Sequence, residues 1–304
     1  MDQPYLFPPG DFERPAEYVQ YYQPPPQDEN RITPGKLLFH LFLLAVTAVT
    51  TTFWGGLLTG GFYRGIVFSF TVLMILGAHE MGHYLACRYY GVPATLPYFI
   101  PSPVGIGTFG AVIKIKGRIP HKRALFDIGI AGPLAGFIFA LPAAVIGIYF
   151  AQPSPAVPTG GDGMVFNDPP LFMAIARLLH VPINVDANPI WLAAWVGCLV
   201  TALNLLPVGQ LDGGHVTYAI FGRRIHTYIA RGIYLGVILL AVASYFRNGW
   251  MGWVIYIIIL TLMIRVGHPP IDDEYEPLDR VRKLVAVFSL IVFLLCFMPA
   301  PISM

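Results

Sequence analysis

Charged residues are scarce in this sequence. Only 12% of its 304 residues are Asp, Glu, Lys or Arg, about half of the roughly 25% that is usual in soluble domains, whereas 56% are hydrophobic. A chain with so few polar side chains cannot cover the surface of a soluble fold of this size. The composition therefore predicts a protein whose main solvent is the lipid bilayer.

Net charge and cysteine content are low as well. The formal net charge is only +2, and no basic stripe interleaved with aromatic residues occurs, so nucleic acid is not an expected partner. The 3 cysteines, Cys87, Cys198 and Cys296, lie far apart in the sequence. They form neither a disulfide framework nor a CxxC metal-binding pattern.

The first 36 residues differ in composition from the rest of the chain. They contain eight prolines and six acidic residues, and they lack the basic, apolar and small-residue regions of a signal peptide. This composition is typical of a disordered segment. We predict a disordered, Pro-rich cytoplasmic tail over residues 1–36, followed by one membrane-embedded domain over residues 37–304.

Seven apolar runs follow the tail. Most are long enough to cross a hydrocarbon core of about 30 Å as helices that rise about 1.5 Å per residue. The predicted spans are residues 37–54, 65–87, 124–150, 190–206, 228–246, 250–264 and 284–298. The last two could form one re-entrant pair, which would leave six spans. The sequence thus predicts an all-α polytopic membrane protein with six or seven transmembrane helices.

Basic residues predict the orientation of the spans. One loop, residues 88–123, has no acidic residue, and basic residues also follow the fourth span. The residues concerned are Arg88, Lys114, Lys116, Arg118, Lys122 and Arg123 in the loop, and Arg223, Arg224 and Arg231 after the fourth span. Because Lys and Arg favour the cytoplasmic side, both segments are predicted to be cytoplasmic, and residues 151–189 form an outer loop.

Residues 94–118 within the basic loop have a different pattern. Pro and Gly interrupt them too often for a spanning helix, yet Thr108 to Lys116 alternate as a strand does. We predict a small β-hairpin that lies at the membrane surface or dips into the membrane, where protein or water must cover its backbone.

The pattern that indicates chemistry is His79-Glu80-Met81-Gly82-His83 in the second apolar run. Residues four apart share one face of a helix, so His79 and His83 can bind one metal ion while Glu80 lies beside the remaining coordination position. This is the pattern of a hydrolytic zinc site, in which the metal lowers the pKa of a bound water to about 7. Glu80 would accept the proton of that water and pass it to the leaving amine. A metal or proton transporter that uses the same residues is the alternative function.

A zinc site of this kind needs a third protein ligand. Asp127, near the start of the third span, and Asp212, after the fourth, are the candidates on the predicted cytoplasmic side. Asp212 has the more suitable surroundings, because Pro207 interrupts the preceding helix and Gly213 lets the backbone bring a carboxylate close to a metal. His215, one helical turn further, is predicted to be a capping residue or a partner of a ligand.

Together these residues resemble the site-2 proteases, a family of intramembrane zinc metalloproteases. His79 to His83 match the family's HExGH motif, and Asn204 to Gly213 match its second motif, although this chain has LDGG where many relatives have NPDG. The resemblance implies one Zn²⁺ per chain with His79, His83 and Asp212 as ligands. It also implies that Asn204 assists Glu80 in catalysis.

Three further segments resemble the EGY-like bacterial and chloroplast subgroup. They are Leu96 to Pro103, Gly107 to Ala111 and Phe126 to Gly136, and the resemblance covers about residues 36–265, without the PDZ or CBS domain of other members. It implies regulated intramembrane proteolysis of single-span membrane proteins in a bacterial inner membrane, with the active site towards the cytoplasm. An exposed edge strand from Thr108 to Ile115, with Thr108, Phe109, Gly110 and Ala111 as substrate-binding residues, could hold the unwound substrate by strand addition, and a hairpin that only plugs the cavity is the alternative.

Overall fold

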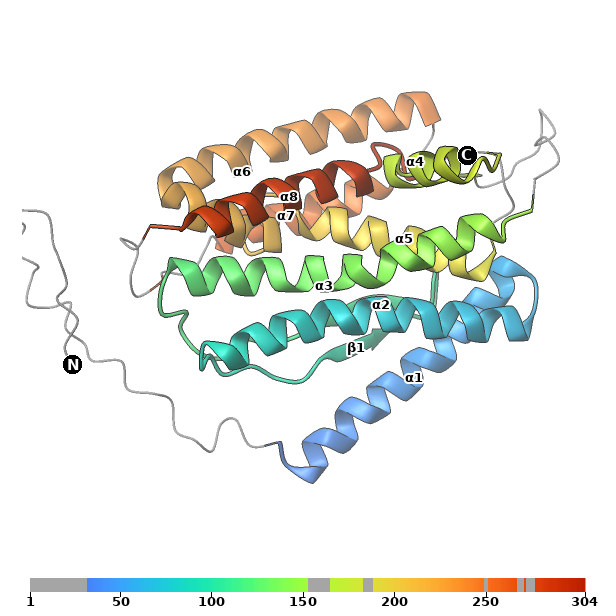
Figure 1. Ribbon diagram of the computed structural model, residues 1–304, viewed down its shortest axis with the longest axis horizontal. Helices are drawn as coiled ribbons and strands as arrows, with labels where there is room; N and C mark the ends of the chain where they lie inside the picture. The colour runs from blue at the N-terminus through green and yellow to red at the C-terminus, as the bar shows by residue number, and fades with distance from the viewer. Residues whose placement is uncertain are drawn as a thin grey trace, which may run out of the picture.

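The computed structural model describes residues 32–152, 165–182, 188–248, 251–266, 271 and 277–303. Most of the predicted tail and part of the predicted outer loop lie outside these residues. The predicted all-α architecture with a small hairpin is confirmed for the described residues (Figure 1). The helices are α1 (Pro34–Thr59), α2 (Phe62–Tyr89), α3 (Lys122–Tyr149), α4 (Pro170–Leu179), α5 (Pro189–Asn204), α6 (Asp212–Asn248), α7 (Gly252–Val266) and α8 (Arg280–Cys296). The strands are β1 (Tyr98–Pro101), β2 (Thr108–Val112), β3 (Val165–Phe166) and β4 (Ile302–Ser303).

Four helices, α1, α2, α3 and α6, are long and apolar enough to cross a membrane, and α5 and α7 are shorter apolar helices. The chain is therefore an integral membrane protein. Each of the seven predicted runs coincides with one helix, but α7 and α8 have only 15 and 17 residues. The choice between six and seven spans stays a prediction.

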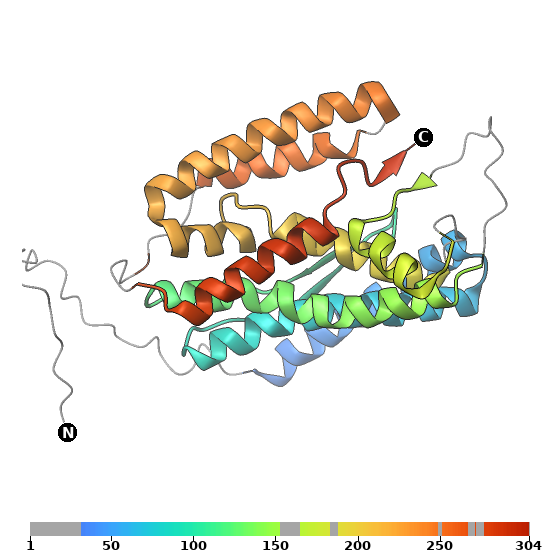
Figure 2. The same cartoon turned by 45° about the horizontal axis from the view of Figure 1, so that its top comes forward.

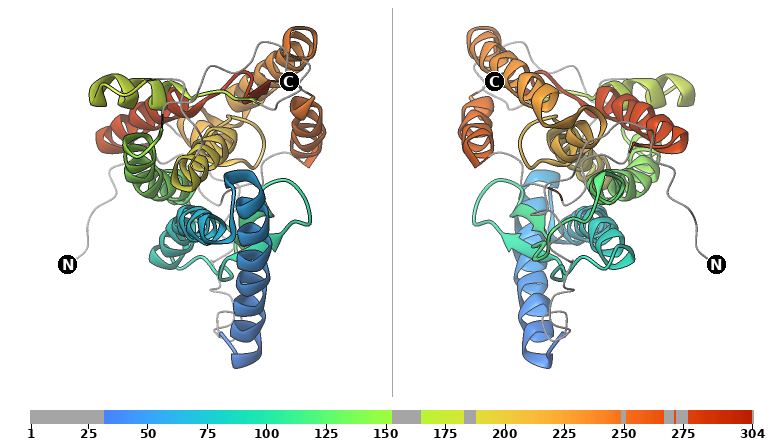
Figure 3. Two further views of the ribbon diagram at one scale, coloured as in Figure 1. Left: turned by 90° about the vertical axis from the view of Figure 1, so that its right-hand side faces the viewer. Right: turned by 90° about the vertical axis from the view of Figure 1, so that its left-hand side faces the viewer.

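Helices α2, α3 and α5 form the centre of the molecule. They pack against one another in one buried core that includes Phe68, Ile75, Phe137 and Trp195. Helices α6 and α7 run side by side along one edge (Figure 2). In the end-on views of Figure 3, α1 stands at the opposite edge with the β-hairpin beside it. The metal-binding motif of α2 is thus placed in the middle of the bundle.

Local signals explain where the central helices begin and end. The His121 side chain accepts a hydrogen bond from the backbone N–H of Ala124 and caps the start of α3. Asn188 caps α5 in the same way, by accepting from the backbone N–H groups of Ile190 and Trp191. Helix α5 ends at Asn204, before the predicted interruption at Pro207.

Helix α6 differs from the prediction. The sequence predicts a loop after the fourth span and a helix that begins near residue 228, whereas the structure is helical from Asp212 onwards. The helix is interrupted at Gly222, whose φ of 75° lies in the left-handed region that glycine adopts most readily. Arg223 and Arg224 therefore lie in a helix, directly after this break.

The predicted hairpin is present and dips into the molecule. Strands β1 and β2 pair antiparallel, with Phe99 opposite Ala111, and an additional bridge joins Ala94 to Ile115. At its turn, the carbonyl oxygen of Gly107 accepts a hydrogen bond from Thr50 Oγ1 of α1 at 2.6 Å. Because α1 is a candidate span, this contact places the turn at the depth of the membrane. The hairpin is buried in part: Phe99 and Ala111 pack in the core, whereas Val104 and Phe109 are exposed.

The described part of the predicted outer loop contains helix α4, which the sequence did not predict. Its ten residues bury Leu171, Phe172 and Ile175 against the core. Before it, the side-chain amide of Asn167 donates to the carbonyl oxygen of Ala300 at 2.6 Å, beside the small pair of β3 and β4. The buried residues of α4 recur at helical spacing, a signal in the sequence that could have indicated this helix.

Asp168, between β3 and α4, provides a prediction about pH. Its Oδ1 atom is buried and forms no hydrogen bond with a described residue, and burial raises the pKa of this carboxyl group to about 6. The folded protein therefore holds the proton more tightly than the unfolded chain, and stability falls as pH rises from about 4 to about 6. Asp168→Asn is expected to raise the free energy of unfolding at pH 7 by about 1 kcal/mol, after allowance for solvent screening, and to have no such effect at pH 4. Thermal unfolding of the detergent-solubilised protein at both pH values measures this, and an equal gain at both would contradict it.

Candidate metal centre

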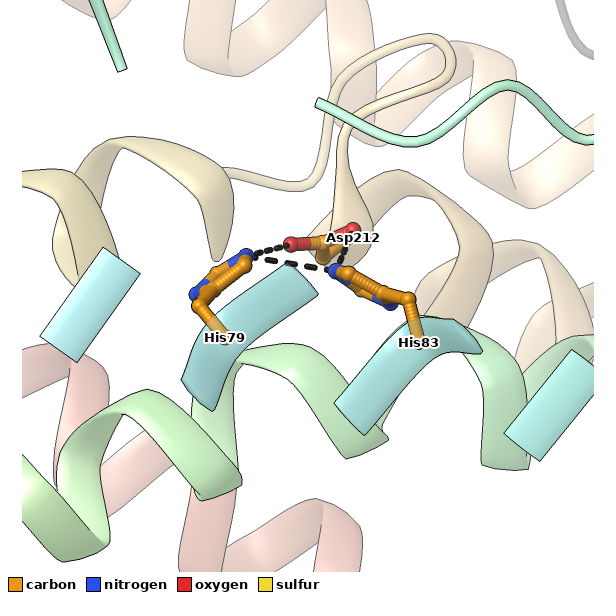
Figure 4. A group of neighbouring side chains, drawn as sticks. All are labelled: His79, His83 and Asp212. Carbon is orange, nitrogen blue, oxygen red and sulfur yellow. Dashed lines mark hydrogen bonds and ion pairs between the residues drawn. The ribbon is translucent and has the colours of Figure 1, made fainter. Parts of the chain in front are cut away.

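His79, His83 and Asp212 come together in the structure (Figure 4). The two histidines lie one turn apart on α2, and Asp212 is the first residue of α6. His79 Nε2 lies 3.2 Å from Asp212 Oδ2, and His83 Nε2 lies 3.3 Å from Asp212 Oδ1. The two Nε2 atoms are 3.2 Å apart. Three donor atoms from helices that are distant in sequence therefore converge on one point.

These separations fit a tetrahedral metal ion. Nitrogen and oxygen ligands that lie about 2.0–2.1 Å from a tetrahedral zinc ion are about 3.3 Å from one another. In this site the two histidine Nε2 atoms are 3.2 Å apart, and they lie 3.2 and 3.3 Å from the two different oxygens of the Asp212 carboxylate. Among the His, Cys, Asp and Glu side chains of the described residues, His79, His83 and Asp212 form the group whose spacing suits a metal ion. The set of donors thus matches the preferences of Zn²⁺.

A hydrogen bond determines which nitrogen of His83 faces the site. His83 Nδ1 lies 2.7 Å from the carbonyl oxygen of Ile128, and because a carbonyl can only accept, Nδ1 carries the hydrogen. The unprotonated Nε2 atom then points its lone pair towards His79 and Asp212. Metal-binding histidines are commonly held by such a bond to their other ring nitrogen.

Two glycines allow the ligands to approach. A Cβ atom at Gly132 of α3 would overlap the ring of His83, and a Cβ atom at Gly213 would overlap the carbonyl group of Leu205. Gly132 thereby leaves room for the imidazole between α2 and α3. Gly213 lets the start of α6 pack on the end of α5, which brings Asp212 to the histidines. The predicted role of glycine beside Asp212 agrees with this packing.

Glu80 and Asn204 lie next to the three ligand candidates. Glu80 is 7% exposed and lines the same cavity as Ile113 of the hairpin segment. Asn204 is the last residue of α5, and its Nδ2 atom lies 3.4 Å from His79 Nε2. Both residues line the same cavity as the histidines. An acid–base group and an amide donor are thus within reach of one point.

This cavity has a volume of about 790 Å³ and connects the metal centre with the hairpin. Its lining combines the polar centre with one continuous stretch of the chain after β2. The lining residues are His79, Glu80, His83, Ala111 to Ile119, Ile128, Asn204, Gln210, Leu211, Asp212, His215 and Ile271. A peptide in this cavity would lie between the hairpin and the group of His79, Glu80, His83 and Asp212.

The four predicted substrate-binding residues differ in their position relative to the cavity. Ala111 lines the cavity, whereas Thr108, Phe109 and Gly110 lie closer to the turn and are not among its lining residues. The lining continues instead through residues 112–119. The predicted edge strand from Thr108 to Ile115 already includes the first half of this stretch, but no single residue after Ala111 is among the predicted substrate-binding residues.

Asp127, the other candidate for the third ligand, takes no part in the centre. Its Oδ1 atom accepts a hydrogen bond from Arg282 Nε of α8 at 2.9 Å, and Oδ2 accepts from the hydroxyl group of Tyr90. Arg282 also pairs with Asp279 at the start of α8. Asp127 thus joins α3 to α8 and to the end of α2. His215, in contrast, lines the cavity and packs against Gly129 of α3.

A buried HExxH helix with a carboxylate from a second helix is the arrangement of a metallopeptidase. A model of peptidase family M50 matches residues 67–243, more than half of the chain. The chain belongs to peptidase family M50, and its resemblance to the site-2 proteases is confirmed.

Curated relatives carry zinc metalloprotease names. The chain is 31% identical over 244 residues to the probable zinc metalloprotease EGY2, chloroplastic, of Arabidopsis thaliana, which covers 79% of this chain and 42% of the relative. It is 32% identical over 250 residues to the protein of the same name from Oryza sativa subsp. japonica, covering 81% and 44%. The chain thus spans less than half the length of these relatives.

A solved site-2 protease from Methanocaldococcus jannaschii shares 18% sequence identity, with coverage of 76% of this chain and 86% of that chain. The TM-score is 0.37, which is too low to compare the positions of individual helices.

Proposed function

We infer that this protein is an intramembrane zinc endopeptidase that hydrolyses peptide bonds within or near the transmembrane segments of single-span membrane proteins. The observation that carries the proposal is the convergence of His79, His83 and Asp212 at separations of 3.2 to 3.3 Å in the centre of a membrane-embedded bundle. Three ionisable groups at this depth are costly unless they bind a partner such as a metal ion.

The proposed ligands of one Zn²⁺ are the Nε2 atoms of both histidines and the carboxylate of Asp212. When bound, zinc supplies a Lewis acid that activates water and polarises a carbonyl group. The hydrogen bond from His83 Nδ1 to the Ile128 carbonyl holds one ligand ring in the required tautomer. His79 comes from the same helix as His83, whereas Asp212 comes from α6, so α2 and α6 together fix the geometry of the site.

Glu80 is proposed as the general base and acid. It accepts a proton from the attacking water and gives it to the nitrogen of the leaving amine. Its position one residue after His79 directs it towards the same cavity, and burial excludes bulk water that would compete for the proton. Asn204, whose amide lies at the same site, would donate a hydrogen bond to the oxygen on which negative charge develops.

The hairpin is proposed to hold the substrate as an added strand. A helix cannot be hydrolysed while its carbonyl groups are tied up in hydrogen bonds, so the substrate must be extended at the site. Ile113 and Glu80 both line the cavity, which supports a position of this strand edge beside the proposed catalytic group. The predicted edge from Thr108 to Ala111 continues this strand towards its turn.

The membrane and its sidedness are part of the proposal. The distribution of Lys and Arg in the loops favours a cytoplasmic position for the side on which Lys114 and Lys116 lie, with the active site open to that side. The EGY-like motifs support a bacterial inner membrane, whereas the relatives named above are chloroplastic. The membership in a peptidase family does not support the alternative of a transporter.

Removal of zinc tests the proposed activity. The full chain in proteoliposomes is expected to cleave a single-span reporter, and 1,10-phenanthroline is expected to reduce the rate at least about a hundredfold, because the metal supplies several kcal/mol of transition-state stabilisation. Dialysis against Zn²⁺ should restore the rate. The non-chelating isomer 1,7-phenanthroline serves as the control, and equal inhibition by both isomers would contradict a metal-dependent reaction.

A further inference from the structure

The stretch that follows β2 has two faces with different chemistry. Exposed and less exposed residues alternate from Val112 to Ile119. The exposed face carries Lys114 and Lys116, followed by Arg118, whereas Ile113 and Ile115 pack with a small apolar cluster at the end of α2. Both lysines belong to the basic loop whose charge predicts the orientation of the membrane spans. Their regular spacing along the cavity wall indicates a second role.

One backbone edge of this stretch is occupied and the other faces the cavity. The carbonyl oxygen of Lys114 accepts from Thr95 N at 3.0 Å, and Lys116 N donates to the carbonyl oxygen of Pro93 at 2.8 Å. In an extended strand the backbone groups of successive residues point to opposite edges. The edge formed by Ile113 and Ile115 therefore faces away from this partner, and both residues line the cavity that also contains Glu80.

The direction of the stretch places the lysines at one side of the membrane. Its deep end is the hairpin turn, where Gly107 contacts Thr50 in the interior of α1. Its other end pairs with residues 93–95, which directly follow α2, where Val92 N donates to the carbonyl oxygen of Cys87 at 2.8 Å. A substrate that adds to the free edge therefore leaves the membrane past Lys114 and Lys116.

Cations dominate this exit. Lys114 and Lys116 form no ion pair with a described residue, and the acidic groups among the described lining residues are Glu80 and Asp212 of the centre itself. Single-span proteins in the same membrane usually carry Lys and Arg on the side where this protein has its own basic loops. Such flanks would be repelled at the exit. The positive charge at the exit thus disfavours substrates with basic flanks. Repulsion of unwanted partners is one way in which a binding site becomes specific.

We propose that Lys114 and Lys116 select substrates that carry Asp or Glu at alternating positions of one flank. This flank is the part of the substrate chain that leaves the membrane on the side of these lysines. This inference rests on the proposed protease function and names the class of substrate for the same site. A strand added beside Ile113 and Ile115 places every second side chain next to the lysine face, where opposite charges stabilise the pair and like charges destabilise it.

The test uses three single-span reporters with an identical membrane segment. Alternating positions directly after this segment carry Glu, Ser or Lys, and the full chain cleaves each reporter in phosphatidylcholine vesicles. We expect kcat/KM to fall about tenfold from the Glu to the Lys reporter, the effect of about two cross-strand charge pairs. The double variant Lys114→Glu/Lys116→Glu should reverse the order.

A matched control changes charge outside the cavity. Arg280 and Lys283 of α8 are exposed near Asp127 and the start of α3 but do not line the cavity. The double variant Arg280→Glu/Lys283→Glu alters net charge by the same amount and should keep the original order of the reporters. A reversal in this control would overturn the proposal, since bulk charge would then explain the effect.

Two other outcomes separate this inference from the proposed function. If the unmodified protein cleaves all three reporters equally, the lysines do not select the flank, although the protease function stands. If it cleaves none of them, the protease function itself fails. If the lysine variant slows all reporters alike, and does so only in vesicles that contain phosphatidylglycerol, then the lysines bind lipid headgroups and the proposal is wrong.

Discussion

Glu80→Gln is expected to abolish cleavage of a membrane-anchored reporter while zinc stays bound at one ion per chain. The substitution keeps the shape of the side chain but removes its ability to accept a proton. General acid–base catalysis contributes about 10² to 10⁴ in rate, and Glu80 is proposed to act in both proton transfers, so we expect a loss of at least about a thousandfold. Reporter cleavage by the full chain in proteoliposomes and zinc content by mass spectrometry measure the two effects.

The neighbouring Met81 provides the control for this experiment. It lies on the same turn of α2 but is not among the residues that line the cavity. Met81→Leu conserves volume and should leave both rate and zinc content within about twofold of the original protein. Undiminished cleavage by Glu80→Gln would refute its role. Loss of zinc from this variant would instead show that Glu80 supports the metal site.

The core of the site could be predicted because its geometry is local. The i, i+4 spacing of His79 and His83 places both rings on one helical face wherever the helix lies. The position of Glu80 follows from the same turn. Pro207 likewise signals the interruption that separates α5 from α6 and allows Asp212 to reach the histidines.

The features of the site that the sequence does not predict depend on contacts between segments that are distant in the sequence. No local pattern shows that His83 donates to Ile128, or that Asp127 pairs with Arg282, 155 residues away. Nor does the strand pattern reveal that Ile113, rather than Thr108, faces the catalytic residues. Such contacts arise from how α2, α3 and the hairpin pack, and packing depends on the whole chain.

The limits of helix α6 were wrong for a different reason. Arg223 and Arg224 break the apolar pattern that marks a membrane span, so the sequence predicts a loop there. In the structure these residues lie in a helix directly after the break at Gly222. Hydropathy marks which residues can lie in lipid, whereas helix length also includes turns that extend into water.

Asp212→Asn is expected to lower zinc affinity more than about a hundredfold and to stop cleavage. The amide keeps the shape of the side chain but lacks the negative charge that attracts a cation. Removal of a residue that only hydrogen-bonds to a metal ligand lowers metal affinity about 10- to 100-fold. Removal of the charge from a ligand itself should therefore lower the affinity further. Zinc content after dialysis against a competing chelator measures the effect. The distances of 3.2 and 3.3 Å from Asp212 to the two histidines are its structural basis.

Asp127→Asn is the matched control, because it makes the same chemical change at the other candidate ligand. The structure pairs Asp127 with Arg282 of α8, so this variant should retain one zinc ion per chain. It should lower the free energy of unfolding by about 1–3 kcal/mol, since a charged hydrogen bond between α3 and α8 is lost. Zinc content and thermal unfolding of both variants, measured side by side, compare these effects. If Asp127→Asn loses zinc and Asp212→Asn retains it, the third ligand is Asp127, and the start of α6 is not part of the metal site.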